Sequence, residues 1–151
     1  MSELVDIAIV GCGGMGRRHL AGLAELARTD HNNVRLAAVC DLDERKAASL
    51  ADEAETMLGM RPGVFTDVGR MAAETEGLVG ADCTTDTPAH HRVGVDLLDH
   101  GLHTMCEKPL ALTMRSCDLI IEAAERNGKI LSVAENFRRD PINRLVRTLI
   151  D

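Results

Sequence analysis

The sequence predicts an α/β fold, a doubly wound parallel sheet of the Rossmann type with strand order 3-2-1-4-5-6. Short apolar runs alternate with helix-patterned segments along all 151 residues, and right-handed crossovers then join parallel strands. The first apolar run leads directly into a glycine-rich turn at residues 11–16. The second run is almost entirely apolar, as in a strand covered on both faces, and it ends at Asp41.

Composition restricts the class of protein and its partners. Apolar residues make up 45% of the chain, with two Phe and neither Trp nor Tyr, so we expect one domain with an aliphatic core. The net charge of −7 argues against nucleic acid or an anionic membrane as a partner. No apolar run approaches the ~20 residues of a membrane span, and we see no signal peptide, so we expect a cytoplasmic protein.

The cysteines and histidines do not predict a metal site. The five cysteines form no C-x-x-C pair, and the six histidines lack zinc-ligand spacing. Reduced, buried thiols in a cytoplasmic protein are the simpler interpretation.

Apolar periodicity gives the elements in chain order. We expect strands at residues 4–10, 34–40, 63–65, 79–85, 102–106 and 129–134. We expect helices at residues 14–27, 44–58, 67–76, 88–100, 114–127 and from 140 onward. In the fifth helix the inward residues are expected to be Met114, Cys117, Ile120, Ile121 and Ala124.

Local signals mark several helix ends. Asp43, Thr87 and Thr113 each stand where an N-cap is expected, and Pro88 then occupies the first helical position. Gly59 stands where the second helix ends. The last helix, which begins at Asp140-Pro141, has no stop signal before the sequence ends.

The glycine turn fits the dinucleotide-binding fingerprint G-x-G-x-x-G. The turn consists of Gly11, Cys12, Gly13, Gly14, Met15 and Gly16. Gly11 permits the tight turn, Gly13 lets the backbone approach a pyrophosphate, and Gly16 lets the helix lie close to the strand. The helix N-terminus then faces the phosphates. An ordinary strand-turn-helix corner would show the same glycines.

Asp41 ends the second strand, where a carboxylate can accept hydrogen bonds from both hydroxyls of an adenosine ribose. It would also repel a 2′-phosphate, which favours NAD over NADP. A solvated turn or a helix cap is the alternative, although Asp43 is the better-placed cap. Arg17, Arg18 and Arg45 could instead accept a 2′-phosphate.

The polar loop after the fourth strand lies at the carboxyl edge of the predicted sheet, where ligands bind in such folds. It consists of Thr85, Asp86, Thr87 and Pro88. It could contact the cofactor, cap a helix, or do both.

Glu107-Lys108-Pro109 places two opposite charges at the end of the fifth strand, beside the expected nicotinamide position. Lys108 could hold a substrate oxygen and stabilise the charge that develops as a carbinol loses its proton. A surface ion pair is an equally simple interpretation.

Asn136, Arg138 and Arg139 follow the sixth strand and could reach the same crevice or merely cover the surface. His90 and His91 begin the fourth helix, where a histidine is more often structural, and they rank below Lys108 as candidates.

Together these residues resemble the Gfo/Idh/MocA family, the glucose-fructose oxidoreductase and inositol dehydrogenase group. The likeness covers the whole chain: the glycine turn, Asp41, Thr87-Pro88, and G-L-H-T-M-C-E-K-P-L-A-L-T at residues 101–113. The segment at residues 136–141 also matches, with Arg138 at the usual arginine. His90 and His91 follow Thr87-Pro88 more tightly than in the family pattern.

The resemblance implies a nicotinamide-dependent oxidoreductase acting on a sugar, cyclitol or related polyol. It places Lys108 at the active site, with Glu107 and Pro109 shaping it. It implies a dinucleotide-binding domain at residues 1–139 and the start of a linker helix at 140–151. A second domain, which we expect to be absent from this sequence, would supply most substrate contacts and a homo-oligomer interface.

Two other classes of protein share some of these residues. A non-catalytic dinucleotide-binding or sensing module working with a partner chain would share the cofactor residues. A methyltransferase that uses S-adenosylmethionine shares a glycine-rich first turn but leaves Glu107-Lys108-Pro109 unexplained.

Overall fold

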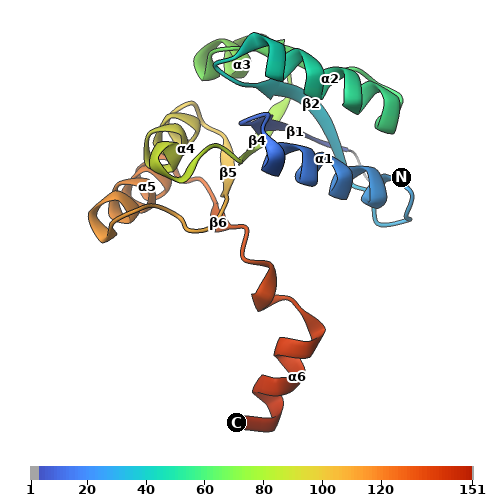
Figure 1. Ribbon diagram of the computed structural model, residues 1–151. Helices are drawn as coiled ribbons and strands as arrows, with labels where there is room; N and C mark the ends of the chain where they lie inside the picture. Colours follow the sequence, from blue (N-terminus) through green and yellow to red (C-terminus); the bar gives the residue numbers. More distant parts are fainter. Residues whose placement is uncertain (1–3, 151) are drawn as a thin grey trace.

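The computed structural model describes residues 4–150, which form a six-stranded parallel sheet with helices on both faces (Figure 1). The strand order β3-β2-β1-β4-β5-β6 confirms the predicted topology. The strands are β1 (Val5–Val10), β2 (Val34–Cys40), β3 (Gly63–Phe65), β4 (Leu78–Cys83), β5 (His103–Cys106) and β6 (Leu131–Val133). The helices are α1 (Gly14–Ala27), α2 (Glu44–Leu58), α3 (Val68–Glu74), α4 (His90–Asp99), α5 (Met114–Asn127) and α6 (Pro141–Ile150).

Aliphatic side chains fill the space between the sheet and each helix layer. On one face α1 and α2 pack against β1 and β2, with Leu20, Leu50 and Ile9 fully buried. On the other face α3 and α4 pack against the central strands around Met71 and Leu97. A third cluster joins α4 to α5. The two layers leave the carboxyl ends of the strands and their loops uncovered, and this edge carries the site.

Most predicted helix ends are confirmed. The Asp43 side chain accepts the Arg45 amide at the start of α2, and Thr113 accepts the Ser116 amide at the start of α5. Gly59 follows α2 in the left-handed conformation, with φ of 78°. These ends depend on local chemistry alone, because a cap or a positive φ involves only neighbouring residues.

The expected start of the fourth helix is wrong. Thr87 provides no capping hydrogen bond. Residues Thr87–Ala89 instead form a short 3₁₀ turn, η1, in which the Ala89 amide donates to the Asp86 carbonyl, and α4 begins only at His90. A second short turn, η2 (Asn136–Arg138), follows β6.

The expected inward face of α5 is wrong in part. Ile120 and Ala124 are buried as expected, but Ala123 is buried with them, while Met114 is 78% and Ile121 42% exposed. The buried face is the one that packs on α4, where Ile120, Ala123 and Ala124 form a cluster with Leu98.

Both neighbours of β1 contain one extra residue. Ile7 and Ala8 pair with Leu36 and Ala38, so Ala37 is skipped. Asp6 and Ile7 pair with Leu78 and Gly80. Such bulges reverse the alternation of side chains along a strand. Leu36 and Ala38 accordingly belong to core clusters on opposite faces of the sheet.

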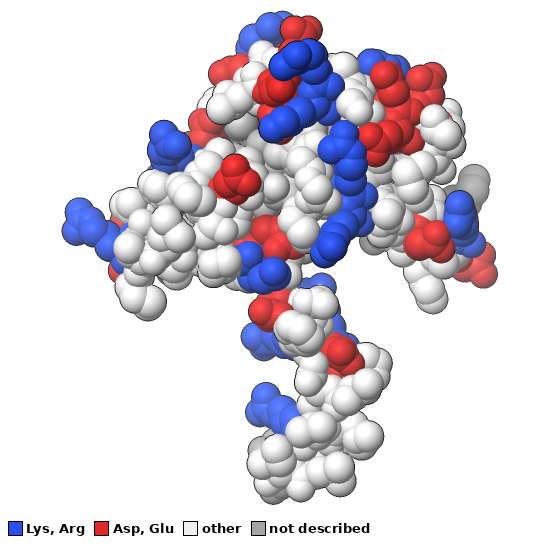
Figure 2. Space-filling model, in the orientation of Figure 1, with Lys and Arg blue, Asp and Glu red and all other residues white. Residues whose placement is uncertain are grey.

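Helix α6 projects away from the sheet (Figure 1). Its apolar side chains are exposed, including Ile142 at 70% and Leu149 at 77%. In the space-filling view the projecting segment is mostly uncharged, whereas acidic and basic side chains are mixed over the helices above it (Figure 2). Among residues 4–150 no helix has both the length and the apolar character needed to cross a membrane.

Candidate functional site

The glycine turn joins β1 to α1 at the carboxyl edge of the sheet. Gly11 has φ of 101°, and a side chain there would lie 2.6 Å from the Thr85 amide nitrogen. Gly16 lies so close to the turn that an added Cβ would be 2.4 Å from the Gly11 carbonyl oxygen. Both positions therefore need glycine for close packing of α1, β1 and the loop after β4.

Gly13 and Gly14 are different, because a Cβ at either position would meet no atom within 4 Å. Their missing side chains leave open space above the first turn of α1. Gly13 offers no capping side chain to that turn, and the turn contains no acidic residue. The helix amides and the positive end of the helix dipole are thus available to an anion.

The Asp41 carboxylate is fixed beside this turn. One of its oxygens accepts the Cys12 amide at 2.8 Å, and the other accepts the Asp43 amide at 2.9 Å. Each carboxylate oxygen has a second lone pair, so both can still accept a hydroxyl proton. Asp43 is the helix cap, and Asp41 is therefore not needed for that role.

A groove of about 460 Å³, which we call the acidic groove, runs from the glycine turn past Asp41 to η1 and α4. Gly11, Gly13 and Thr85 contribute to its wall. Its charged lining residues are Asp41, Asp43, Lys46, Asp67, Asp86 and Asp96. Five carboxylates face a single ammonium group, which makes the groove unfavourable for an additional phosphate.

Arg17, Arg18 and Arg45, the arginines near the turn, do not line this groove. Arg17 donates to the Glu53 carboxylate, the Ser49 hydroxyl and the Cys12 carbonyl, and it thereby joins α1 to α2. Arg45 is paired with Asp43, with its side chain 93% exposed. Arg18 lines a different groove.

This second groove, which we call the lysine groove, has a volume of about 880 Å³ and lies between α1 and the segment after β6. Met15, Lys108 and Asn136 line it, together with Arg139. The Lys108 side chain is exposed, and the Lys108–Pro109 peptide bond is cis. Arg138 is exposed and does not line either groove.

Glu107 is a mostly buried residue in the wall of the lysine groove, where His19 lies with it. One of its carboxylate oxygens accepts the Lys108 amide at 2.9 Å, and the other lies 3.2 Å from Nε2 of His19. Nδ1 of His19 lies 3.0 Å from the Asp82 carboxylate. The sequence analysis missed this cluster, although Asp82 is an acidic residue within an otherwise apolar strand and therefore signals a buried partner.

His90 connects the two loops that flank the grooves. Its ring is 1% exposed, and its nitrogens lie 2.9 Å from the carbonyl oxygens of Thr85 and Pro109. Thr87 and Pro88 lie in η1 and do not line either groove. The geometry gives His90 a structural contact with backbone rather than a surface that a ligand could reach.

The cysteines near the glycine turn are inert thiols. Burial, with a further contribution from the nearby Asp41 carboxylate, raises the pKa of Cys12 to about 12. Burial likewise raises the pKa of Cys40 to about 12. Within residues 4–150 no cluster of histidine, cysteine and carboxylate groups could hold a metal ion.

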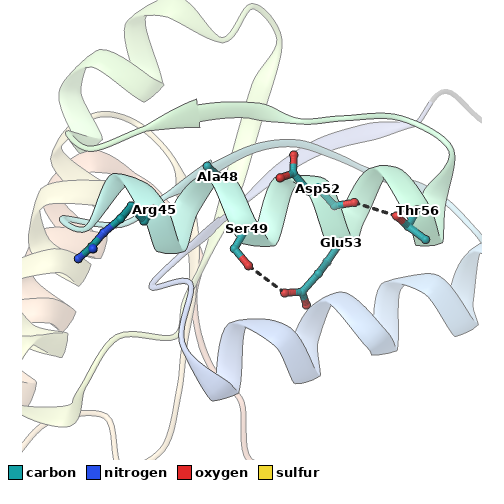
Figure 3. Close-up of a pocket in the computed structure, with 6 residues that line it drawn as sticks. All are labelled: Arg45, Ala48, Ser49, Asp52, Glu53 and Thr56. Carbon is teal, nitrogen blue, oxygen red and sulfur yellow. Dashed lines mark hydrogen bonds between the residues drawn. The ribbon is translucent and has the colours of Figure 1, made fainter.

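A shallow hollow of about 520 Å³ lies along α2 and shares no lining residue with the two grooves (Figure 3). All six of its lining residues come from this one helix. Ser49 donates to Glu53, and the Thr56 hydroxyl donates to the Asp52 carbonyl. Because its charged side chains are already paired with Asp43, Arg61 and Arg17, it is a weaker candidate than the two grooves.

Comparison with known proteins identifies relatives of the whole chain. The family model for Gfo/Idh/MocA proteins, described as an oxidoreductase family with an NAD-binding Rossmann fold, matches residues 5–135. An inositol 2-dehydrogenase of Burkholderia cenocepacia is 30% identical over 149 residues. A second inositol 2-dehydrogenase, from Saccharopolyspora erythraea, is 33% identical over 150 residues. Each alignment covers 97% of this chain and 41% of the relative.

A solved structure shows the same fold. The myo-inositol 2-dehydrogenase of Lactobacillus plantarum superimposes with a TM-score of 0.80 and 25% identity, over 99% of this chain and 41% of that one. The present chain therefore spans less than half the length of these relatives.

Proposed function

The chain belongs to the Gfo/Idh/MocA oxidoreductase family, which has an NAD-binding Rossmann fold, and from this premise we propose that residues 1–139 form the cofactor domain of an NAD-dependent polyol dehydrogenase. The proposed reaction transfers hydride between NAD and a sugar, cyclitol or related polyol. The relatives named inositol 2-dehydrogenase support this class of substrate.

The observation that carries the proposal is the position of the glycine turn between two grooves. Gly11 and Gly13 line the acidic groove, and Met15 lines the lysine groove. A dinucleotide has two nucleosides joined by a pyrophosphate, so one molecule can occupy both grooves and place its phosphates over the open Gly13. The exposed first turn of α1 then supplies the amides that bind them.

The acidic groove fits the adenosine half of NAD. Asp41 has free lone pairs for the two ribose hydroxyls, and its carboxylate is held rigidly by two backbone amides. The surplus of carboxylates would repel the extra phosphate of NADP. Arg17 is already bonded to α2. We therefore propose a preference for NAD.

The lysine groove fits the nicotinamide half of NAD and the substrate. The bound nicotinamide ring would supply the hydride acceptor. In the proposed mechanism the carbinol hydrogen leaves as hydride to the nicotinamide, and the hydroxyl proton passes to a general base of the substrate domain that the resemblance implies. Lys108 donates a hydrogen bond to the substrate oxygen and stabilises the negative charge that develops on it. Met15, Glu107 and Asn136 line the same groove and would exclude water or orient the ligand.

Two further residues of the predicted site have indirect roles in this proposal. His90 holds the Thr85 and Pro109 loops together rather than contacting the cofactor. Cys12 contributes its amide to Asp41. All five cysteines are free, which supports a reducing cytoplasmic location.

Calorimetric titration with NADH tests the proposal through Gly13→Val. A Cβ at this position meets no atom within 4 Å, so we expect the fold to be preserved, but the valine side chain occupies the space assigned to the pyrophosphate. We expect at least tenfold weaker binding, which is about 1.4 kcal/mol. The control is Gly22→Val, in α1, where a Cβ also meets no atom within 4 Å and where the residue lines neither groove. This variant should bind NADH with the wild-type affinity.

Equal affinity of the wild type and Gly13→Val would contradict the phosphate site. A folded wild-type protein that bound no NADH would overturn the proposed function as a whole.

A further inference from the structure

A histidine that no part of the proposed mechanism uses lies between two carboxylates in the wall of the lysine groove. His19 lies on α1. Its Nδ1 is 3.0 Å from the carboxylate of Asp82 on β4, and its Nε2 is 3.2 Å from the carboxylate of Glu107, which follows β5. The three side chains are only 15%, 11% and 8% exposed. The contact joins three elements that are distant in sequence.

The geometry selects the protonation state of the ring. A neutral imidazole has one N–H group and can donate to only one of two carboxylates. The other carboxylate oxygen would then face a lone pair. The doubly protonated ring donates to both, and the hydrogen bond to Asp82 raises the pKa of His19 above its usual value of 6.5, against the opposing effect of burial.

The same contact reaches Lys108 through Glu107. The Glu107 oxygen that does not face His19 accepts the Lys108 amide, and the Glu107 amide donates to the Cys83 carbonyl. One oxygen of the Glu107 carboxylate thus bonds to His19 of α1, and the other bonds to the backbone amide of Lys108. Losing the His19 proton would remove one of the bonds that hold this carboxylate in place.

We propose that protonated His19 is a positioning residue, which fixes Glu107 and thereby the backbone of Lys108 at the edge of the lysine groove. The proposal rests on the proposed function in one respect: a defined position of Lys108 matters because Lys108 is the residue proposed to contact the substrate. Asp82 and Glu107 contact the ring directly. The other charged groups that line the groove beside His19 and Glu107 are Arg18, Lys108, Glu135, Arg139 and Asp140.

The sign of the pH dependence follows from the raised pKa. A group whose pKa is higher in the folded state stabilises that state fully below its unfolded pKa, and the contribution disappears as the pH rises through the folded value. His19 should therefore hold Glu107 most firmly below pH 6.5 and release it as the pH rises through its raised folded pKa.

Nuclear magnetic resonance of the cofactor-free protein between pH 5.5 and 9.5 tests this directly. We expect the His19 ring to titrate above 6.5 and the Lys108 amide to shift with the same midpoint. In His19→Gln that step should disappear from the Lys108 amide. His31→Gln, which changes an exposed histidine away from both grooves, should retain it. A merely structural histidine would not couple its titration to Lys108.

Thermal unfolding gives a second measurement. The melting temperature of His19→Gln should lie further below the wild type at pH 6 than at pH 9, whereas His31→Gln should show the same difference at both. A His19 ring that is neutral at pH 6, or a Lys108 amide whose shift does not follow it, would overturn the proposal. Because neither experiment contains NADH, these outcomes are independent of the cofactor titration.

Discussion

Replacing Gly16 by alanine should destabilise the protein, although alanine favours helices. In an exposed helix the change would increase the free energy of unfolding by about 1 kcal/mol. Here the new Cβ would lie 2.4 Å from the Gly11 carbonyl oxygen and 3.3 Å from the Ile9 side chain. That carbonyl accepts the Thr84 hydroxyl at 2.7 Å, so it is not free to move aside.

The magnitude follows from these two opposing effects. Overpacking in a close-packed interior costs about 1–3 kcal/mol, and a backbone oxygen that is held in place favours the upper part of this range. Subtracting the helix preference leaves a net loss of about 1–2 kcal/mol. For a domain of this size the melting temperature should fall by roughly 2–8 °C.

Urea unfolding followed by circular dichroism measures the effect, and Gly22→Ala is the matched control. Gly22 lies in the same helix, where a Cβ would meet no atom within 4 Å, so this variant should gain about 0.5–1 kcal/mol. The two variants should therefore change stability in opposite directions. A Gly16→Ala protein as stable as Gly22→Ala would refute the close approach of α1 to the turn.

Two further predictions concern cofactor choice and the core. Fluorescence titration should show the wild type binding NADH at least tenfold more tightly than NADPH, about 1.4 kcal/mol. Asp41→Asn should reduce this difference in affinity, because it removes a charge-assisted hydrogen bond to the ribose and the repulsion of the 2′-phosphate. Asp30→Asn, at an exposed aspartate, should leave the difference unchanged. A wild-type preference for NADPH would contradict the ribose-binding role of Asp41. Ile120→Ala should cost about 2–5 kcal/mol in urea unfolding because the side chain is fully buried between α4 and α5. Leu119→Ala, at a side chain that is 41% exposed, should cost far less, and equal losses would contradict the observed face of α5.

The features predictable from the sequence are those that depend on neighbouring residues. The parallel sheet followed from alternating elements and right-handed crossovers, and the strand order from a glycine-rich first turn in a chain of six strands. The ends of α2 followed from Asp43 and Gly59, whose conformations depend on one turn of chain. The position of Asp41 beside the glycine turn followed from the parallel arrangement of β1 and β2.

The features that were missed depend on tertiary packing. Thr87 has the chemistry of a cap, but the chain first forms the η1 turn, and its amides bond within that turn. The inward face of α5 includes Ala123 because of how closely α4 approaches. His19 meets partners 63 and 88 residues away, and no local pattern encodes such separations.

The extra residues beside β1 have a consequence for protein engineering. The extra residues are Ala37 in β2 and Val79 in β4. Each lies between the start of its strand and the carboxyl-terminal part that leads to the loops around the two grooves. A chimera that exchanged β2 or β4 for a regular strand of a homologue would be one residue short. Its downstream side chains would then change faces, and Asp82 would no longer lie beside Ile9 on the side of α1. Loop grafts that begin after these two positions keep the present orientation, and strand grafts must carry the additional residue with them.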